Sequence, residues 1–431
     1  MAALDTGDTA WILASSGAVL LMTPGLAFFY GGMVRAKNVL GILVQNFFTI
    51  GIVTLVWTVV GYSIAFGSGN KFWGGFDFVG LQDLTASDTT IPAVVFVSFQ
   101  MMFAIITPAL ITGASADRIK FSAFAVFVVL WSVLVYSPIA HWVWASTGWL
   151  YKRGALDFAG GTVVHANAGI AAIVLAVALG KRRGWPAGDF RPHNVPFVLL
   201  GTGLLWFGWF GFNAGSALGA NKVAGYAFLN TQIATGVALL GWIAVERLRD
   251  GKATALGAAS GAVAGLVAIT PACGFVSPLG SIAVGAIAGV VCALATAIKG
   301  RVGIDDSLDV GAVHLIGGVL GALLTGLFAT VDTNPNGKDG VFYGGPWSVF
   351  GEQALAVGAT VAYSAVATAI IAYAIKFVWG LRVSDEEEEI GLDESQHGET
   401  AYRLTFTGGG TGTGGASGSA TPVQVSEEVK A

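Results

Sequence analysis

Long stretches without a charged side chain limit what this chain can fold into more than any other feature. The segment from Ala253 to Ile298 contains no Asp, Glu, Lys or Arg, and shorter stretches of the same kind recur through most of the chain. Hydrophobic residues make up 54% of the sequence, charged residues only 11%, and the mean hydropathy is +0.71. Because so few polar side chains cannot cover a surface in water, the sequence predicts an integral membrane protein.

A bilayer core requires roughly 20 apolar residues per transmembrane helix, and the apolar stretches divide into about eleven such units. Pro271, Gly274, Pro278 and Gly280 predict a turn that splits the longest stretch in two. We therefore expect an all-α integral membrane protein with eleven transmembrane helices, at about residues 9–31, 41–66, 92–115, 121–143, 160–180, 195–214, 224–245, 254–271, 279–298, 310–330 and 348–379.

The distribution of basic residues predicts how these helices are oriented. Segments reached after an odd number of crossings carry fifteen Lys and Arg residues, and those reached after an even number carry five. The positive-inside rule then places the odd side in the cytoplasm, with the N-terminus outside and the C-terminus inside a cell membrane. The opening MAALDTGDTAW lacks the basic stretch of a cleavable signal peptide, so we expect the first apolar segment to be retained as a span.

Two histidines lie inside apolar stretches, and each belongs to a VHxxxG pattern. The patterns are VHANAG, which contains His165, and VHLIGG, which contains His314. Ionisable side chains at membrane depth are costly, so a repeated pair favours a transport site, although hydrogen bonding between helices is the alternative for either histidine alone. The two spans run in opposite directions, which indicates an inverted repeat of five plus five helices followed by one long C-terminal helix. Whether the two rings touch is left open.

Aspartates precede both histidine-bearing spans. Asp157, before the fifth span, is expected either to cap free backbone N–H groups at a helix start or to attract a cation. Asp305 and Asp309, before the tenth span, invite the same capping interpretation. The other histidines, His141, His193 and His397, are expected to be interfacial or solvated.

Several classes of function are disfavoured by the sequence. Cys273 and Cys292 have neither metal-ligand spacing nor the pattern of a disulfide framework. The sequence shows no nucleotide-binding loop or nucleophile triad, so we expect no enzymatic activity and no cofactor. The acidic excess of the chain lies in its C-terminal tail, and no nucleic-acid surface is indicated.

Five longer motifs occur in a characteristic set: DFAGGTVVHANAG (Asp157–Gly169), LLWFGWFGFNAGS (Leu204–Ser216), FQMMFAIITPALITGA (Phe99–Ala114), DDSLDVGAVHLIGG (Asp305–Gly318) and GLRVSDEEEEIGLDESQHGETAY (Gly380–Tyr402). Together they resemble the ammonium transporter family (Amt/Mep/Rh), on its bacterial or archaeal Amt branch, up to about residue 406. The resemblance implies an eleven-helix protomer with its own pore, a homotrimer, and contact between the pore histidines His165 and His314.

The resemblance also implies roles for aromatic residues outside the histidine pair. An outer site that recruits ammonium would consist of Trp144, Phe103 and Ser216, with Trp142 and Trp149 as nearby alternatives to Trp144. Phe103 and Phe212 would form a gate over the pore. Phe99 and Trp209 would form the wall that supports this gate.

These residue types suit ammonium chemically. Aromatic faces can replace part of a cation's hydration, and a hydroxyl can accept an N–H bond. Ammonium can lose a proton and cross an apolar passage as ammonia, whereas potassium cannot, so we expect selectivity to depend on deprotonation. Neutral imidazoles could bind ammonia and relay the proton. Methylammonium is a suitable analogue for measurement.

The sequence divides into three parts by composition. Residues 1–380 are expected to form the transmembrane transporter domain, residues 381–406 a cytoplasmic regulatory tail, and residues 407–431 a Gly-rich flexible extension. The resemblance implies that the tail meets a PII-type signalling protein. Two other functions compete with ammonium transport: an ammonium sensor with little net flux, and a sodium-coupled amine carrier, for which the spans lack a carboxylate cluster.

Overall fold

The computed structural model describes residues 3–84 and 90–402. Within these residues the fold is helical, and pairing between extended segments is limited to the isolated bridges Ile119–Arg382 and Val276–Ala329. Residues up to Ala401 form one compact unit. The Gly-rich extension expected at residues 407–431 lies outside the described residues.

Seventeen α-helices and seven short 3₁₀- or π-helical segments make up the described part of the chain. In chain order they are α1 (Thr6–Met33), η1 (Ala36–Asn38), α2 (Val39–Val56), η2 (Trp57–Gly61), α3 (Tyr62–Phe66), η3 (Val79–Leu81), α4 (Ala93–Ser115), α5 (Phe121–Trp131), η4 (Ser132–Tyr136), α6 (Ser137–Trp144), α7 (Trp149–Arg153), η5 (Gly161–Ala166), α8 (Asn167–Leu179), α9 (Val195–Gly215), α10 (Lys222–Asp250), α11 (Ala255–Ile269), α12 (Pro278–Ala295), α13 (Ile298–Val302), η6 (Gly311–Ile316), α14 (Gly317–Phe328), η7 (Val341–Tyr343), α15 (Trp347–Val378), α16 (Asp385–Ile390) and α17 (Leu392–His397).

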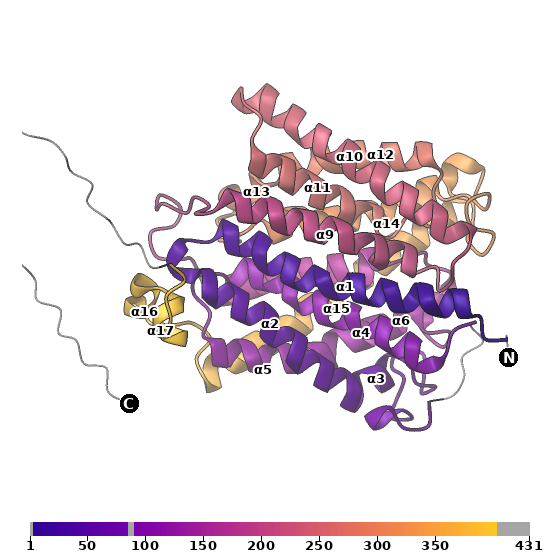
Figure 1. The fold of residues 1–431 in the computed structure, drawn as a ribbon, viewed down its shortest axis with the longest axis horizontal. Coiled ribbons are helices and arrows are strands. Elements are labelled where there is room, and N and C mark those ends of the chain that lie inside the picture. The colour runs from indigo at the N-terminus through magenta and orange to yellow at the C-terminus, as the bar shows by residue number, and fades with distance from the viewer. Residues whose placement is uncertain (1–2, 85–89, 403–431) are drawn as a thin grey trace, which may run out of the picture. The chain divides into compact units, whose positions relative to one another are not determined.

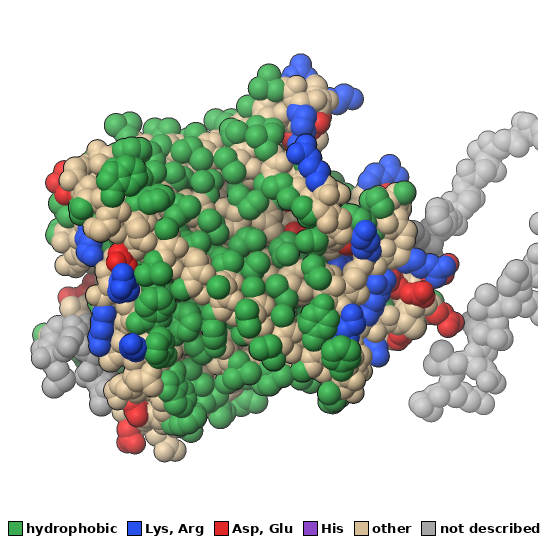
Figure 2. All heavy atoms as spheres, turned by 180° about the vertical axis from the view of Figure 1, so that it is seen from behind, with side chains coloured by type: hydrophobic (Ala, Val, Ile, Leu, Met, Phe, Trp, Pro, Cys, Tyr) green, Lys and Arg blue, Asp and Glu red, His purple; other side chains and the backbone are tan. Residues whose placement is uncertain are grey.

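Ten helical stretches among the described residues are long and apolar enough to cross a membrane. They coincide with ten of the expected spans, and the remaining one, at residues 254–271, corresponds to α11, a shorter apolar helix of 15 residues. Figure 2 shows a broad band of hydrophobic side chains over one face of the molecule, with charged side chains gathered toward its two ends. The chain is therefore a multi-pass membrane protein.

The long helices lie roughly side by side, with α1 beginning at one end of the bundle and α16 and α17 lying at the other (Figure 1). We call these ends the N-terminal side and the tail side. Helix α1 packs along α9, and α10 packs against both α11 and α12.

Glycines allow α10 and α12 to approach until their backbones touch. A Cβ atom placed at Gly285 or Gly289 would overlap the backbone of α10, at Ala234 and Ala238 respectively. Gly261 and Gly265 of α11 face the same helix in the same way. Small residues at such contacts are typical of helix packing in membranes, where van der Waals contact replaces the hydrophobic effect.

Replacement of Gly289 by Leu is expected to destabilise the protein by roughly 1–3 kcal/mol, because the new side chain has no space against Ala238. Thermal unfolding of the detergent-solubilised protein measures the effect. Gly358→Leu is the matched control, since a Cβ at Gly358 on α15 meets nothing within 4 Å. Equal melting temperatures for the two variants would contradict the close packing.

The tail folds back onto the loops of the tail side. Backbone bonds join Lys120 N–H to the Leu381 carbonyl (3.1 Å) and Val383 N–H to the Arg118 carbonyl (3.1 Å). The Asp393 carboxylate accepts from Gly41 N–H at 2.8 Å. The segment 381–401 is thus an integral part of the compact unit and connects loops that are distant in the sequence.

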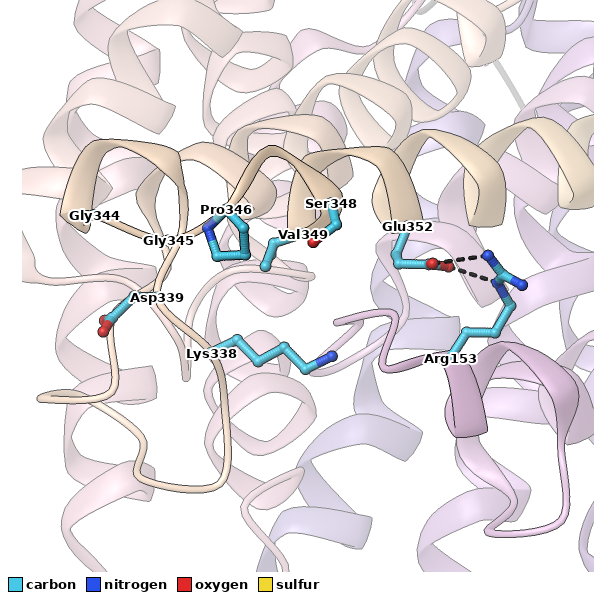
Figure 3. Close-up of a pocket in the computed structure, with 9 residues that line it drawn as sticks. All are labelled: Arg153, Lys338, Asp339, Gly344, Gly345, Pro346, Ser348, Val349 and Glu352. Atoms are coloured by element: carbon cyan, nitrogen blue, oxygen red, sulfur yellow. Dashed lines mark hydrogen bonds and ion pairs between the residues drawn. The ribbon is translucent and has the colours of Figure 1, made fainter.

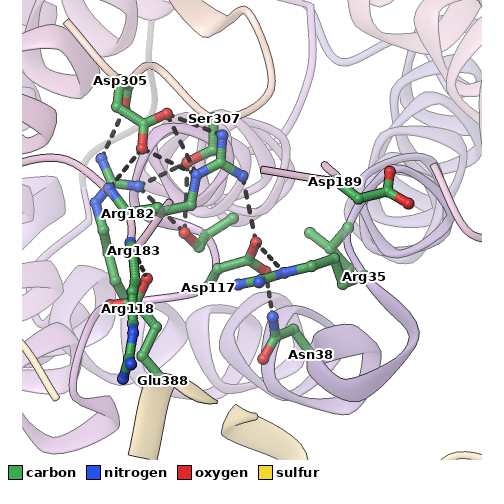
Figure 4. Close-up of polar contacts among 12 residues, drawn as sticks. Arg35, Asn38, Asp117, Arg118, Arg182, Arg183, Asp189, Asp305, Ser307 and Glu388 are labelled. Carbon is green, nitrogen blue, oxygen red and sulfur yellow. Dashed lines mark hydrogen bonds and ion pairs between the residues drawn. The ribbon is translucent and has the colours of Figure 1, made fainter. Parts of the chain in front are cut away.

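A buried cluster of charged side chains holds these loops together (Figure 4). The guanidinium of Arg182 contacts Asp305 at 2.8 Å and Asp117 at 3.2 Å. Arg118, which is fully buried, donates to the Ser307 hydroxyl and to the Asp305 carbonyl, both at 2.7 Å. Burial raises the pKa of the Asp305 carboxyl, but the hydrogen bonds and charge of Arg182 outweigh burial and hold that pKa below its usual range.

Arg182→Met is expected to destabilise the protein by roughly 3–5 kcal/mol, because it leaves the buried Asp305 carboxylate without its ion pair and leaves Asp117 paired with Arg35 alone. The depressed pKa of Asp305 adds stability that is present above the ordinary aspartate pKa and is lost as the pH falls through the native value. Acidification should therefore lower the melting temperature of the native protein more steeply than that of the variant.

The control for this measurement is Arg249→Met, which removes a half-exposed ion pair with Asp250 and should cost at most about 1 kcal/mol. If both variants melted alike at neutral pH, the cluster would not stabilise the tail side.

Candidate functional site

Two short π-helical segments, η5 and η6, cross in the middle of the bundle and carry the two motif histidines. The last glycine of each motif packs against the backbone of the other segment. A Cβ at Gly169 would overlap Leu315, and a Cβ at Gly318 would lie 2.7 Å from Ala166 N. The spacing VHxxxG therefore places each histidine close to a glycine at which the backbones of the two segments touch, and only glycine leaves room for this contact.

The crossing brings the two imidazole rings together. His165 Nδ1 and His314 Nδ1 are 3.3 Å apart, the ring centroids are separated by 5.4 Å, and the ring planes differ by 23°. Both side chains are buried, with 1% and 3% of their surface exposed. The rings predicted from the motifs thus contact each other, and the question that the sequence left open is answered.

The contact constrains the protons on the two rings. When both rings are neutral, a hydrogen bond between two Nδ1 atoms requires one nitrogen to carry the proton and the other to accept it, so the rings hold opposite tautomers. His165 Nε2 is buried and has no hydrogen-bond partner among the described residues. This nitrogen is available to bind a small polar molecule.

Aromatic rings extend from the histidine pair toward the N-terminal side. His165 stacks on Trp209 at 5.4 Å and lies 6.1 Å from Phe212. Phe212 stacks on Phe103 at 4.2 Å, and Phe99 meets Phe103 edge-on at 5.0 Å. The residues expected to form a gate and its wall are therefore contiguous with the histidines.

A cavity of about 300 Å³ lies beyond this stack, and Phe103, Trp144 and Ser216 all line it. Trp144 meets Phe103 edge-on at 5.7 Å. The alternatives lie elsewhere, because Trp142 packs against Tyr363 at 4.8 Å and meets Trp149 at 5.9 Å. Geometry favours Trp144 as the tryptophan of this cavity.

Gln100 also lines this cavity, a residue that the sequence analysis missed. Its Oε1 atom is buried and has no hydrogen-bond partner within the described chain. The Ser216 hydroxyl donates to the Phe212 carbonyl at 2.8 Å, which leaves its own oxygen free to accept. An amide between the apolar neighbours Phe99 and Met101 is the signal that could have identified Gln100.

Asp157 caps the start of η5. Its two carboxylate oxygens accept backbone N–H bonds from four consecutive residues, at 2.7–3.0 Å. Its own carbonyl accepts from the Trp144 indole at 3.0 Å. The capping interpretation is thus supported by the structure, and the same residue fixes the indole that lines the cavity.

The capping predictions for Asp305 and Asp309 are wrong. Asp305 instead binds Arg182, and Asp309 forms an ion pair with Lys299 at 2.8 Å. The carboxylate that accepts from the first amides of η6, at 2.7 and 3.1 Å, belongs to Asp306. Burial, and then the charge of Asp309, raise the pKa of Asp306 to about 6. The solvated position that was one of the two expected for His141 is wrong, because its side chain is fully buried.

A second cavity, of about 570 Å³, lies between the end of α7 and the start of α15 (Figure 3). Its main polar feature is a bidentate pair in which Arg153 donates to Glu352 at 2.7 and 2.8 Å. It lies apart from the histidines and from the aromatic stack. Within residues 3–84 and 90–402, no group of three or more His, Cys, Asp or Glu side chains is arranged to hold a metal ion.

The fold and the central residues together define a class: a multi-pass helical membrane protein in which two closely packed helices, each with a π-helical first part, bring a histidine pair together beneath stacked aromatic rings. Comparison with known proteins gives the family. The profile of the Ammonium Transporter Family matches residues 10–402, which is most of the chain. This protein belongs to the ammonium transporter family.

Individual relatives agree with this assignment. The chain is 53% identical to an ammonium transporter of Mycobacterium tuberculosis, with 94% of this chain and 92% of the relative covered. It is 45% identical to the ammonium transporter Amt1 of Archaeoglobus fulgidus, with 93% and 100% covered. The curated relatives are named as transporters and not as enzymes.

Solved structures share the fold. The crystal structure of Saccharomyces cerevisiae Mep2 superposes with a TM-score of 0.85 at 35% identity, covering 89% of this chain and 90% of that one. A structure titled Sensor Amt Protein superposes equally well, with a TM-score of 0.85 at 31% identity and with 91% and 98% covered.

The capping role of Asp157 is open to direct measurement. Asp157→Ala should destabilise the protein by roughly 1–3 kcal/mol, because it removes the acceptor for four backbone N–H groups. Asp157→Asn, which keeps one acceptor oxygen, should recover part of the loss in thermal unfolding. An Ala variant as stable as the native protein but inactive would instead indicate that the charge itself is required.

Proposed function

We propose that this protein transports ammonium across the cell membrane, with the N-terminal side outside and the tail side in the cytoplasm. The observation that carries the proposal is the contact between His165 and His314 beneath the aromatic stack, in a chain that belongs to the ammonium transporter family. Both the split of basic residues and the docking of the charged tail on one side support the orientation.

Ammonium would be recruited in the 300 Å³ cavity. The faces of Trp144 and Phe103 replace part of the hydration shell by cation–π attraction, worth about 0.5–2 kcal/mol for each ring. The Ser216 hydroxyl and the unpaired Gln100 carbonyl oxygen accept N–H bonds. These are the groups that a small cation with several N–H donors requires.

Passage beyond the cavity requires Phe103 and Phe212 to separate, because their stacked rings close the way to His165. The residues beneath are buried and largely apolar, so an intact cation would lose its hydration without a replacing charge, at a cost that approaches 20 kcal/mol in the idealised Born limit. Ammonia does not bear this cost. Deprotonation at the aromatic stack therefore selects ammonium over potassium.

The histidine pair serves the neutral species and the proton separately. The free Nε2 of His165 accepts a hydrogen bond from ammonia. When this Nε2 takes up a proton, the Nδ1 proton of His165 passes to Nδ1 of His314 and His314 releases its own Nε2 proton, so that both rings stay neutral and their tautomers interchange. Phe99 packs against the ring of Phe103, and Trp209 packs against the ring of His165. The Thr270 hydroxyl accepts a hydrogen bond from the Trp209 indole at 2.9 Å and so fixes this wall.

The larger assembly forms the rest of the proposal. The protomer has eleven spans, with α11 completing the ten longer stretches, and an inverted repeat relates the segments η5 and η6. Three protomers associate, each with its own pore in residues 1–380. Residues 381–406 form the regulatory tail that meets a PII-type signalling protein.

Substitution of the two histidines tests the mechanism. In reconstituted vesicles, His165→Ala and His314→Ala should each reduce methylammonium uptake by at least about tenfold. Each should also raise the ratio of potassium current to methylammonium uptake. His193→Ala is the control, since its ring contacts the Val34 carbonyl on the tail side, remote from the pore motifs. Unchanged selectivity against potassium in both pore variants would remove the mechanism.

An ammonium sensor with little net flux is the second candidate, and the similarity to a structure titled Sensor Amt Protein is the observation that favours it. The same vesicles distinguish the two functions. A native protein that binds methylammonium but does not transport it would be a sensor.

A further inference from the structure

The most unusual buried polar group outside the pore is the imidazole of His141. Its ring lies near the C-terminal end of α6 and has no exposed surface. Nδ1 lies 2.9 Å from the carbonyl oxygen of Ala65, and Nε2 lies 2.7 Å from the carbonyl oxygen of Asn70. Both ring nitrogens therefore face backbone oxygens that can only accept hydrogen bonds.

A neutral imidazole cannot satisfy this arrangement. In either neutral tautomer one nitrogen bears a lone pair, and that lone pair would point at a carbonyl oxygen within 3 Å. The Thr147 hydroxyl, at 3.3 Å from Nε2, does not remove the repulsion, because the Asn70 oxygen remains closer. Only a ring that is protonated on both nitrogens donates to both oxygens.

The position within the helix provides a further source of negative potential. Helices α5, η4 and α6 follow one another without a break from Phe121 to Trp144, and His141 lies in the last turn. Unpaired carbonyl groups at a helix C-terminus stabilise a nearby cation. The two carbonyl contacts and the helix end thus favour charge in the same place.

We propose that His141 is a buried imidazolium that fastens the end of α3 and the loop Gly67–Gly75 to the end of α6 and so positions Trp144. The loop is held from the same region by two more bonds: the Trp142 indole donates to the Phe72 carbonyl at 2.7 Å, and Trp149 N–H donates to the Lys71 carbonyl at 3.1 Å. Trp144 is the last residue of α6, three positions after His141. A positively charged ring thereby holds in place the helix end that presents the recruiting indole.

The surrounding titratable groups do not supply a counter-charge by direct contact. The elements that pack against α6, the loop Gly67–Gly75 and the residues directly after the loop carry Tyr62, Lys71, Asp77, Tyr136, Tyr151, Lys152, Arg153 and His165. Asp77 is the single carboxylate among these residues, and it accepts from Ser68 N–H at 2.8 Å. The carbonyl oxygens are therefore the partners that favour the charged ring.

Solid-state nitrogen NMR of the full-length protein in lipid bilayers tests the charge directly. The chain has five histidines, and the signals that disappear in His141→Gln belong to this ring. At about pH 7.5 both nitrogens should be protonated and correlate with the carbonyl carbons of Ala65 and Asn70, a correlation that assigns them even if the variant does not fold. An unprotonated ring nitrogen at that pH would overturn the proposal.

Uptake kinetics test the positioning of Trp144, and this arm rests on the proposed transport function. The apparent KM of His141→Gln for methylammonium should be at least about threefold higher than that of the native protein, with little change in maximal rate. His193→Gln is the control and should follow the native protein. A KM of His141→Gln equal to the native value would refute positioning, whereas a native protein without uptake would refute transport and leave the NMR result to decide the charge.

Discussion

The close crossing of η5 and η6 is the contact on which the rest of the site depends. Gly169 and Gly318 each lie against the backbone of the opposite segment, where any side chain would force the two apart. Because each histidine lies four residues before its glycine, the crossing determines where both rings are held. Asp157 and Asp306 secure the crossing from opposite sides of the bundle by accepting the free amides at the start of each segment.

The chemistry of the site follows from this geometry together with burial. Two neutral rings that share one proton between their Nδ1 atoms leave the Nε2 of His165 free inside an apolar surrounding. The stacked rings of Phe103 and Phe212 separate that nitrogen from the cavity on the N-terminal side. Under the proposed function, the cavity provides for a charged form of the substrate and the histidine pair for a neutral one, so the proton must leave between them.

Much of this arrangement could be predicted from the sequence, because apolar length alone locates membrane helices. The repeated VHxxxG pattern also identified the two central residues. Position along the chain could not show which aspartate of DDSLD reaches the amides of η6, since that depends on side-chain direction at an irregular turn. The sequence also could not show that the carbonyl oxygens of Ala65 and Asn70 contact the ring of His141, because a contact between segments about 70 residues apart depends on tertiary folding.

Transport by Gly318→Val, a variant that retains both histidines but crowds the crossing, tests the account most directly. Methylammonium uptake into vesicles should fall about as far as it does when a pore histidine is removed, whereas Gly351→Val, on an open part of α15, should transport normally. Native rates and selectivity in Gly318→Val would contradict the claim that the close approach of the two segments creates the pathway.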